Sequence, residues 1–325
     1  MGDRTGIAWT DATWNPVRGC SRVSEGCRNC YAEAVAARFS HTGAPYFGFA
    51  DHTRPGSKWT GKVELIPGQL DLPLRWRRPR RVFVNSMSDL FHESLADDVI
   101  DQVFGIMALA PQHTFQVLTK RPDRMRRWFE RDRPRTAPAE CLAAAYVENP
   151  ALARRRPLDT DRAVAVGLAG WPLPNVWLGV SVEDQASADS RIPHLLQVPA
   201  AVRFLSCEPL LSAVDLRHLT MRDGWRDALG GRLHTGPAII SGEPSVQWVI
   251  VGGESGPGAR TMRRQWADDL LRQCKAAGVP AFFKQVGSHR WGEWPPAITG
   301  KGDDLAEWPE GLRVQEFPVT VEQHD

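Results

Sequence analysis

The chain has 325 residues, of which 42% are hydrophobic and 24% are charged, and its formal net charge at pH 7 is +2. This composition is that of an ordinary globular protein with a substantial core, the small charge does not by itself indicate a nucleic-acid partner, and six cysteines are too few for a disulfide scaffold. The sequence shows no signal-peptide pattern and no apolar run of about 18 residues, so we expect a cytoplasmic protein without a membrane span.

Short apolar runs that end in polar residues alternate with helical patterns along most of the chain. A short first strand is predicted in "TWNPVRGC" from Thr13, and a helix from Tyr31 to Phe39. Apolar residues recur at helical spacing over Ala96–Ala110 and over Gln265–Ala277, which Gly278 ends. The longer strands are predicted in "RVFVNSMSD" from Arg81, "TFQVLTKRP" from Thr114, "NVWLGVSVED" from Asn175, "VRFLSCEPL" from Val202, "QWVIVGGESG" from Gln247 and "PAFFKQVG" from Pro280.

This alternation predicts parallel βαβ units whose strands are covered on both faces. Six or seven such units fit either a doubly wound sheet or a partial or full β/α barrel. We treat residues 1–325 as one domain with two insertions. The first, at about 131–174, is expected to be partly helical, and the second, at about 212–246, to form turns or a hairpin.

Polar side chains follow each of the six longer predicted strands. In both architectures the working residues gather at the carboxyl ends of the strands. Six polar strand ends in succession therefore favour a common pocket for a polar substrate over six unrelated solvated loops. The residues are Asn85, Ser86, Ser88 and Asp89; Lys120 and Arg121; Ser181 and Glu183; Cys207 and Glu208; Glu254 and Ser255; Lys284 and Gln285.

Three of the cysteines, Cys20, Cys27 and Cys30, form a C-x6-C-x2-C pattern. A closed zinc site would need a fourth ligand, for which His41 and His52 are available without a familiar spacing. A redox C-x-x-C pair would leave Cys20 unused. In an iron–sulfur cluster, three thiolates on a 4Fe–4S cube would leave one iron open to a substrate or cofactor. The helix that follows would then direct its free N–H groups at the anionic cluster.

These motifs resemble two related groups of proteins. Three cysteines in a loop after the first strand of a β/α barrel resemble the radical S-adenosylmethionine (SAM) superfamily, where the usual spacing is C-x3-C-x2-C. Segments from residue 7 to residue 287 are similar to the phage-type three-cysteine-motif family of unknown function, which itself resembles radical SAM enzymes. They are "IAWTDATWNPVRGCSRVSEGCRNCYAE", "PRRVFVNSMSDLFHE", "FQVLTKRP", "WLGVSVEDQASADSRIPHL", "RFLSCEPLL", "WVIVGGESGPGAR" and "FFKQVG".

The resemblance implies a partial or full TIM-like β/α barrel with a 4Fe–4S cluster on the three cysteines and SAM on the open iron. It places the SAM amino group at the end of the second strand, the ribose or carboxylate at the fourth strand, and the adenine at a glycine-rich late strand. A solvated helix start and a glycine turn are the structural alternatives for the last two sites. The matching residues are Asn85, Ser86 and Ser88; Glu183 and Arg191; Gly252, Gly253 and Glu254.

Three strand-end residues are candidates for catalysis. Cys207 is either a hydrogen-atom donor in a radical reaction or a packed thiol, and Glu208 is a proton acceptor or substrate ligand. Lys284, with Lys120 and Arg121, would hold an anionic group or neutralise the acids of the pocket.

The first hypothesis is therefore a radical SAM enzyme that abstracts hydrogen from an unknown substrate, of which a nucleic acid or nucleotide is one candidate. The alternatives are a zinc-binding nucleic-acid module on the same barrel, and a metal-free hydrolase that uses Glu208 and Glu254. The runs "RWRRPRR" from Arg75 and "KRPDRMRRW" from Lys120 suit either a nucleic-acid surface or a solvated face. An electron donor and a three-Cys-motif partner protein are the other partners that the resemblance implies.

Overall fold

The computed structural model describes residues 5–53, 56–131, 141, 143–146, 154, 170–236, 238–290 and 292–319. Contacts divide the chain into two compact units. Unit 1 consists of Met1–Gly179 and Val198–Ala201, and unit 2 consists of Val180–Gln197 and Val202–Asp325. Within the described part of the chain, no helix is long and apolar enough to cross a membrane.

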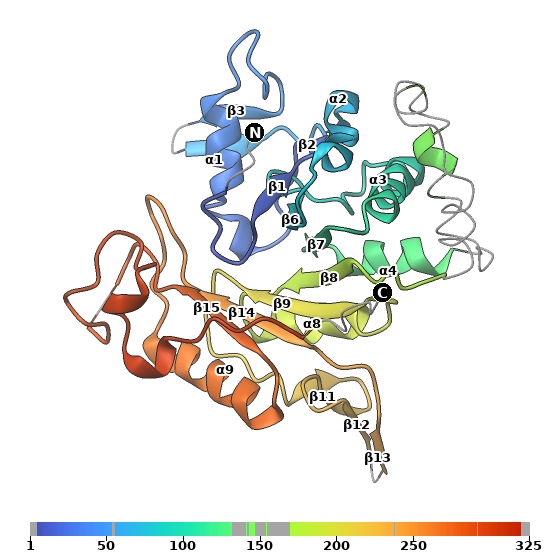
Figure 1. Ribbon diagram of the computed structural model, residues 1–325. Helices are drawn as coiled ribbons and strands as arrows, with labels where there is room; N and C mark the ends of the chain where they lie inside the picture. Colours follow the sequence, from blue (N-terminus) through green and yellow to red (C-terminus); the bar gives the residue numbers. More distant parts are fainter. Residues whose placement is uncertain are drawn as a thin grey trace. The chain divides into compact units, whose positions relative to one another are not determined.

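The main sheet has seven strands in the order β1-β6-β7-β8-β9-β14-β15 (Figure 1). The pairs β1–β6, β6–β7, β9–β14 and β14–β15 are parallel. This order follows the chain and never reverses. A doubly wound sheet would reverse it at a switch point, whereas a β/α barrel keeps it. The predicted α/β class with six to seven parallel strands is confirmed, and the strand order is of the barrel type.

Unit 1 begins the sheet with β1, β6 and β7, whose register sets Ala12 beside Val82 and Val82 beside Phe115. The predicted helices at Tyr31 and Ala96 are present within a residue or two of the expected bounds. The elements are β1 (Ala12–Trp14), β2 (Val17–Arg18), η1 (Glu25–Cys27), α1 (Tyr31–Arg38), β3 (Ala50–Thr53), β4 (Gly56–Trp59), β5 (Glu64–Leu65), α2 (Pro67–Leu70), η2 (Leu72–Arg75), β6 (Arg81–Val84), α3 (Asp97–Leu109), β7 (Thr114–Thr119), α4 (Pro122–Glu130) and most of β8 (Val176–Ser181).

The core of unit 1 lies where α3 and α4 meet. Phe104 on α3 is fully buried and stacks on Trp128 of α4 with ring centroids 4.5 Å apart. Gly105 of α3 is needed where the helix approaches Cys141, because a Cβ there would lie 2.1 Å from the Cys141 carbonyl oxygen. Cys141 and Ala145 are buried. Most of the insertion predicted at 131–174 lies outside the described residues.

Unit 2 contains the later strands, two helices and a separate sheet. Residues 212–246 contain the antiparallel strands β10–β13, in that order. Asp184 caps α8 in a reciprocal capping box with Ser187, and Gly278 ends α9 at φ 66°. The elements are α8 (Gln185–Leu195), β9 (Val202–Cys207), β10 (Leu219–Met221), β11 (Gly224–Asp227), β12 (Arg232–Thr235), β13 (Ala238–Ser241), β14 (Trp248–Gly252), α9 (Arg264–Ala277), β15 (Ala281–Gln285), η3 (Leu305–Glu307) and η4 (Glu310–Leu312).

Candidate functional site

The cysteine loop of unit 1, residues 19–30, starts at a glycine that no other residue could replace. Gly19 has φ 87°, and a Cβ on it would lie 1.9 Å from the carbonyl oxygen of Lys62. Gly19 also forms an isolated parallel bridge with Ser88, just beyond β6. The close backbone approach therefore fixes Cys20 beside the carboxyl end of a strand of the main sheet.

The three thiols of this loop are neighbours. Cys20, Cys27 at the end of η1, and Cys30 at the N-cap of α1 are all free and half-buried. Charge interactions connect Cys20 with Cys30 and Cys30 with Cys27. In the described ranges, no group of three or more His, Cys, Asp and Glu side chains is arranged to hold a metal ion.

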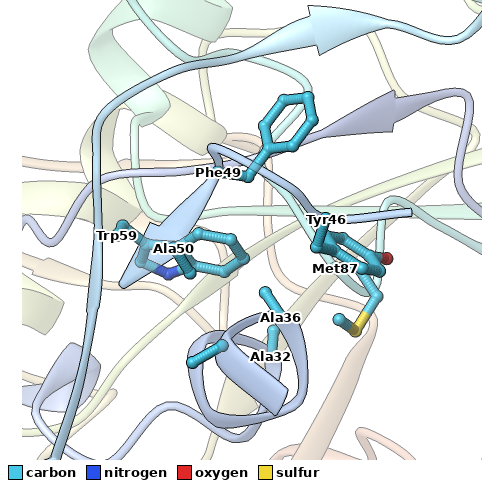
Figure 2. Close-up of a cluster of buried hydrophobic side chains, with 8 residues drawn as sticks. Ala32, Ala36, Tyr46, Phe49, Ala50, Trp59 and Met87 are labelled. Carbon is cyan, nitrogen blue, oxygen red and sulfur yellow. The ribbon is translucent and has the colours of Figure 1, made fainter. Parts of the chain in front are cut away.

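Cys20 and Cys30 pack against an apolar cluster that fixes α1 to the β3–β4 hairpin. Figure 2 shows Ala32 and Ala36 on the side of α1 that faces this cluster. The cluster therefore provides a rigid, water-poor floor beneath two of the three thiols. Its members are Ala32, Ala36, Ala37, Tyr46, Phe49, Ala50, Trp59 and Met87.

Burial makes these thiols weak acids. It raises the pKa of Cys20 to about 12, with a further rise from Asp89 and an opposing effect from Arg121. Burial also raises the pKa of Cys30, while the backbone N–H groups of Glu33 and Ala32 at the start of α1 lower it. The helix start thus directs donors at Cys30, as expected for an anion next to a helix N-terminus.

Arg121 is the centre of the polar network next to Cys20. Its side chain is 3% exposed, and its Nη1 donates to Cys20 Sγ at 3.8 Å and to Asp89 Oδ2 at 3.1 Å. Its Nε donates to Glu93 Oε2 at 2.8 Å. Asp89 also accepts from the Thr119 hydroxyl at 2.7 Å. A buried cation is therefore held in place by two acids, with one face directed at a thiol.

A histidine that sequence reasoning missed completes this network. His92 Nε2 lies 2.8 Å from Ser21 Oγ, and Arg121 Nη2 donates to the same hydroxyl at 2.8 Å. Because His92 Nδ1 accepts from the Ser94 N–H at 3.1 Å, the proton of a neutral ring is on Nε2. Burial lowers the pKa of His92, which favours that neutral form. The only sequence signal was the position of "DLFHE" shortly after a strand end.

A second missed residue holds the loop from the other side. Glu33 is buried and accepts from Arg22 Nε at 3.0 Å and from the Trp59 N–H at 2.7 Å. This carboxylate joins the cysteine loop and α1 to β4. Glu33 therefore helps to hold the thiols in position. It also keeps the partly exposed Arg22 side chain near them.

The strand end after β6 carries three of the residues predicted to bind SAM, and the structure gives their present hydrogen-bond partners. The Ser88 hydroxyl donates to the Val17 carbonyl at 2.9 Å, and the Ser86 hydroxyl bonds to Asn15 at 3.2 Å. Both hydroxyls thus hold the β1–β2 region. Asn85 is different: it has φ 59°, is 2% exposed, and its Nδ2 has no partner among the described residues.

An unpaired buried amide is uncommon and indicates a ligand, a water molecule or strain. The Asn85 amide orientation is set by Oδ1, which accepts from the Val17 N–H at 3.4 Å. Nδ2 therefore remains as the unused donor of this strand end. Asparagine also tolerates the left-handed backbone better than most residues.

The candidate acids of unit 2 are each matched by a cation. Glu183 and Arg191 form a buried ion pair in which Nη1 lies 2.9 Å from Oε2, and Arg191 also donates to the Ser181 carbonyl at 2.8 Å. This geometry serves the connection between β8 and α8. Within unit 2 it favours the structural interpretation of the pair.

The remaining strand ends of unit 2 follow the same pattern. Lys284 Nζ contacts both carboxylate oxygens of Glu208, at 2.7 and 2.8 Å, and Gln285 Nε2 donates to Glu208 at 3.1 Å. Cys207 is fully buried, and burial raises its pKa well above the ordinary value. Cys207 thus has the environment of a packed thiol.

The "VGGESG" segment is organised around one carboxylate. Glu254 accepts from Arg260 Nε at 3.0 Å and from the Arg260 backbone N–H at 2.8 Å. Gly253 has no room for a side chain, because a Cβ would lie 1.9 Å from the Val286 carbonyl oxygen. Gly252 lies near the Glu208 carboxylate, 3.5 Å from where its own Cβ would be. Close packing therefore explains Gly253, whereas a Cβ at Gly252 would make only ordinary contacts.

The second basic run is largely neutralised, and the first is neutralised only in part. In α4 and just after it, Arg124, Arg126, Arg127 and Arg131 each pair with an acid. Arg75 and Arg81 of the first run also pair with acids, whereas Arg77 and Arg78 are exposed. The pairs of the second run favour a solvated, charge-balanced face over a phosphate-binding one.

Comparison with known proteins shows one family. The family described as "Protein of unknown function (DUF5131)" matches residues 4–311. No curated protein and no solved structure matches the chain. Since the family match covers nearly the whole sequence, the protein belongs to this family of unknown function.

Proposed function

We propose that the protein is an iron–sulfur enzyme of the radical SAM type, with a 4Fe–4S cluster held by Cys20, Cys27 and Cys30. One observation carries the proposal: three free, half-buried thiols occur on one loop beside a strand end of a β/α sheet, with Cys30 near enough to interact with both Cys20 and Cys27. The odd number of thiols suits a cluster that keeps one iron open.

The surroundings of the thiols fit an anionic cluster. Burial raises the pKa of Cys20 to about 12 and also that of Cys30, so bare thiolates would be costly there. Arg121 donates to Cys20 Sγ, and backbone N–H groups at the start of α1 favour the thiolate of Cys30. These donors offset part of the negative charge that a cluster and its thiolates bring.

When bound, such a cluster would supply the electron that cleaves SAM reductively to a 5′-deoxyadenosyl radical. The chain's own contribution is to bind and to orient. The unused Nδ2 of Asn85 is a donor suited to an acceptor group of SAM, such as its carboxylate. The apolar cluster against which Cys20 and Cys30 pack covers one side of these thiols.

In unit 2 we assign Glu208 and Lys284 to substrate binding and proton transfer, with Cys207 as a hydrogen-atom donor. The partly exposed Glu208–Lys284 pair, at 2.7 Å, would exchange its mutual contact for contacts with a polar substrate. A nucleotide or nucleic acid remains the substrate candidate.

The test is anaerobic reconstitution of the full chain with iron and sulfide, followed by addition of SAM and dithionite. The expected result is a brown protein with about four irons and four sulfides per chain that forms 5′-deoxyadenosine. Single changes of Cys20, Cys27 or Cys30 to alanine should abolish product formation. Cys141→Ala is the matched control, because this buried thiol lies outside the cysteine loop.

The opposite outcome is equally defined. A colourless protein that retains stoichiometric zinc and forms no 5′-deoxyadenosine would overturn the proposal in favour of the zinc-binding module. Full activity on a substrate after loss of all three loop thiols would favour the metal-free hydrolase.

A further inference from the structure

The small antiparallel sheet of unit 2 has one covered edge and one open edge. Its strand order is β10-β11-β12-β13, so β10 and β13 are the two edges (Figure 1). β10 is bonded to α8, because the Thr220 N–H donates to Asp189 Oδ1 at 3.1 Å. All residues of β13, Ala238–Ser241, are exposed. The edge formed by β13 is therefore the one open to a further strand.

β13 lacks the features by which proteins usually protect an edge strand. Such strands commonly carry charged side chains, a proline or a bulge that hinder further pairing. β13 has the sequence AIIS, and each of its residues is paired in register with β12. Ile239 is 62% exposed and Ile240 is 44% exposed. Because neighbouring side chains alternate, one isoleucine lies on each face of the sheet.

The backbone of β13 is also suited to pairing. In an antiparallel ladder, alternate residues direct their N–H and C=O groups away from the partner strand. β13 pairs with β12 on one side and is the last strand of its sheet, so every second residue directs these groups at the open edge. When a peptide adds to such an edge, the backbone ladder supplies affinity and the alternating side chains supply specificity.

One cation next to this edge has no acid of its own. Arg232 of β12 is exposed and lies opposite Ser241 of β13. The acid on its other side, Asp227, accepts instead from Arg217 Nε at 3.3 Å and from the Gly230 N–H at 2.7 Å. Within the described part of the chain, Arg232 forms no ion pair. Because the Ser241 side chain is short, the guanidinium has a path across it to a strand beyond β13.

These features define the occupant of the edge. Read from its N-terminus, an antiparallel strand would set an acid opposite Ser241, near Arg232, and apolar residues opposite Ile240 and Ile239. We propose that β13 is the docking edge for an extended segment of a partner protein with the pattern acidic–apolar–apolar. A second copy of β13 fits less well, because AIIS brings no acid to Arg232. The proposal does not depend on the cysteine loop.

The experiment measures peptide binding to the full chain by fluorescence anisotropy. The probe is a capped, fluorescein-labelled peptide, Ser-Thr-Glu-Val-Val-Thr-Ser. A second peptide has lysine in place of glutamate, and a third has Pro-Pro in place of Val-Val, which stays apolar but cannot donate to the ladder. The wild type should bind the glutamate peptide about tenfold more tightly than the lysine peptide, the effect of one charged hydrogen bond. It should not bind the proline peptide.

A charge reversal in the protein tests the role of Arg232. Arg232→Glu should reverse the preference, so that the lysine peptide binds more tightly than the glutamate peptide. Arg222→Glu is the matched control, because Arg222 is an exposed arginine in the turn between β10 and β11. This control should keep the wild-type preference. Hydrogen exchange of the amides at 238–241 should slow when the glutamate peptide is bound.

Three results would overturn the inference. Equal affinities for the three peptides would mean that they adhere to the isoleucines without forming a ladder. Binding of none of the peptides would mean that the shortness of β13 is enough to protect it. A dimer in light scattering that Ile239→Lys dissociates would show that a second copy covers the edge. None of these results bears on the formation of 5′-deoxyadenosine, so the proposed function is tested separately.

Discussion

The strand ends of the two units differ in how their charges are matched. In unit 2, Glu183, Glu208 and Glu254 each face a cation of their own: Arg191, Lys284 and Arg260. In unit 1, one cation, Arg121, is shared by Asp89 and Glu93 and also donates to a thiol. At the end of β6, Asn85 keeps a donor without a partner in the described structure.

A one-to-one ion pair satisfies both groups and needs no ligand. A shared cation with one face on a thiol is stable as it stands but is also suited to stabilise added negative charge at that thiol. The comparison therefore supports the cysteine loop of unit 1 as the place of the proposed chemistry. The pairs of unit 2 have a structural role unless a substrate displaces them.

The largest expected effect is that of Arg121→Met, which removes the shared cation of unit 1. Removing the cation leaves Asp89 buried with an uncompensated charge, so we expect the free energy of unfolding to fall by about 3–5 kcal/mol. Urea unfolding of the cluster-free protein measures it. Arg127→Met is the control, because that exposed pair with Asp123 should contribute less than about 1 kcal/mol. Adding Asp89→Asn to Arg121→Met should recover part of the loss.

An equally small effect of Arg121→Met and Arg127→Met would contradict the network. It would mean that water already screens Asp89, so that the two arginines are equivalent surface cations.

The second prediction concerns thiols that are buried without a cation nearby. Burial raises the pKa of Cys274 to about 12, and it also raises that of Cys207. Below pH 9 both thiols are protonated whether the chain is folded or unfolded, so they do not make stability depend on pH. Above pH 9 only the unfolded chain loses these protons, so stability falls by up to about 1.4 kcal/mol per pH unit for each thiol.

Urea unfolding at pH 8, 9, 10 and 11 measures this slope. In Cys274→Ala the slope should be shallower by up to about 1.4 kcal/mol per pH unit over the same interval. An unchanged slope would show that Cys274 is not protonated by burial and that other groups cause the alkaline loss of stability.

The parts of the fold that could be predicted are those with a local signal. The apolar runs from Arg81 onward predicted β6, β7, β8, β9, β14 and β15, and helical spacing predicted α3 and α9. The β3–β4 hairpin could not be predicted, because "ADHT" and "GSKW" have no alternating apolar pattern. The hairpin is stabilised by contacts with α1, which no local pattern encodes.

The same distinction applies to the candidate site. The cysteine spacing was visible in the sequence. The hydrogen bonds of the site were not, because His92 bonds to Ser21, 71 residues earlier, and Glu33 bonds to Trp59, 26 residues later. Such pairings depend on the tertiary fold. The serines after β6 stay predicted ligands, and the tertiary bonds of their hydroxyls to the β1–β2 region had no signal in the sequence.

The smallest expected effect comes from Asn85, which separates backbone strain from ligand binding. Both Asn85→Gly and Asn85→Ala remove the Nδ2 donor and the acceptor of the Val17 N–H. Only alanine is also strained by a backbone φ of 59°. The Asn85→Ala protein should therefore be less stable than the Asn85→Gly protein by about 1 kcal/mol. Urea unfolding of the two variants gives this difference directly.

Affinity for SAM supplies the second measurement on the same pair. If the amide donates to SAM, calorimetry on the reconstituted protein should show a similar loss for glycine and alanine, about tenfold for one hydrogen bond. A loss for alanine alone would assign Asn85 to the backbone of the β6 turn and not to ligand binding. Wild-type affinity in both variants would remove Asn85 from the site and leave its buried donor to a water molecule.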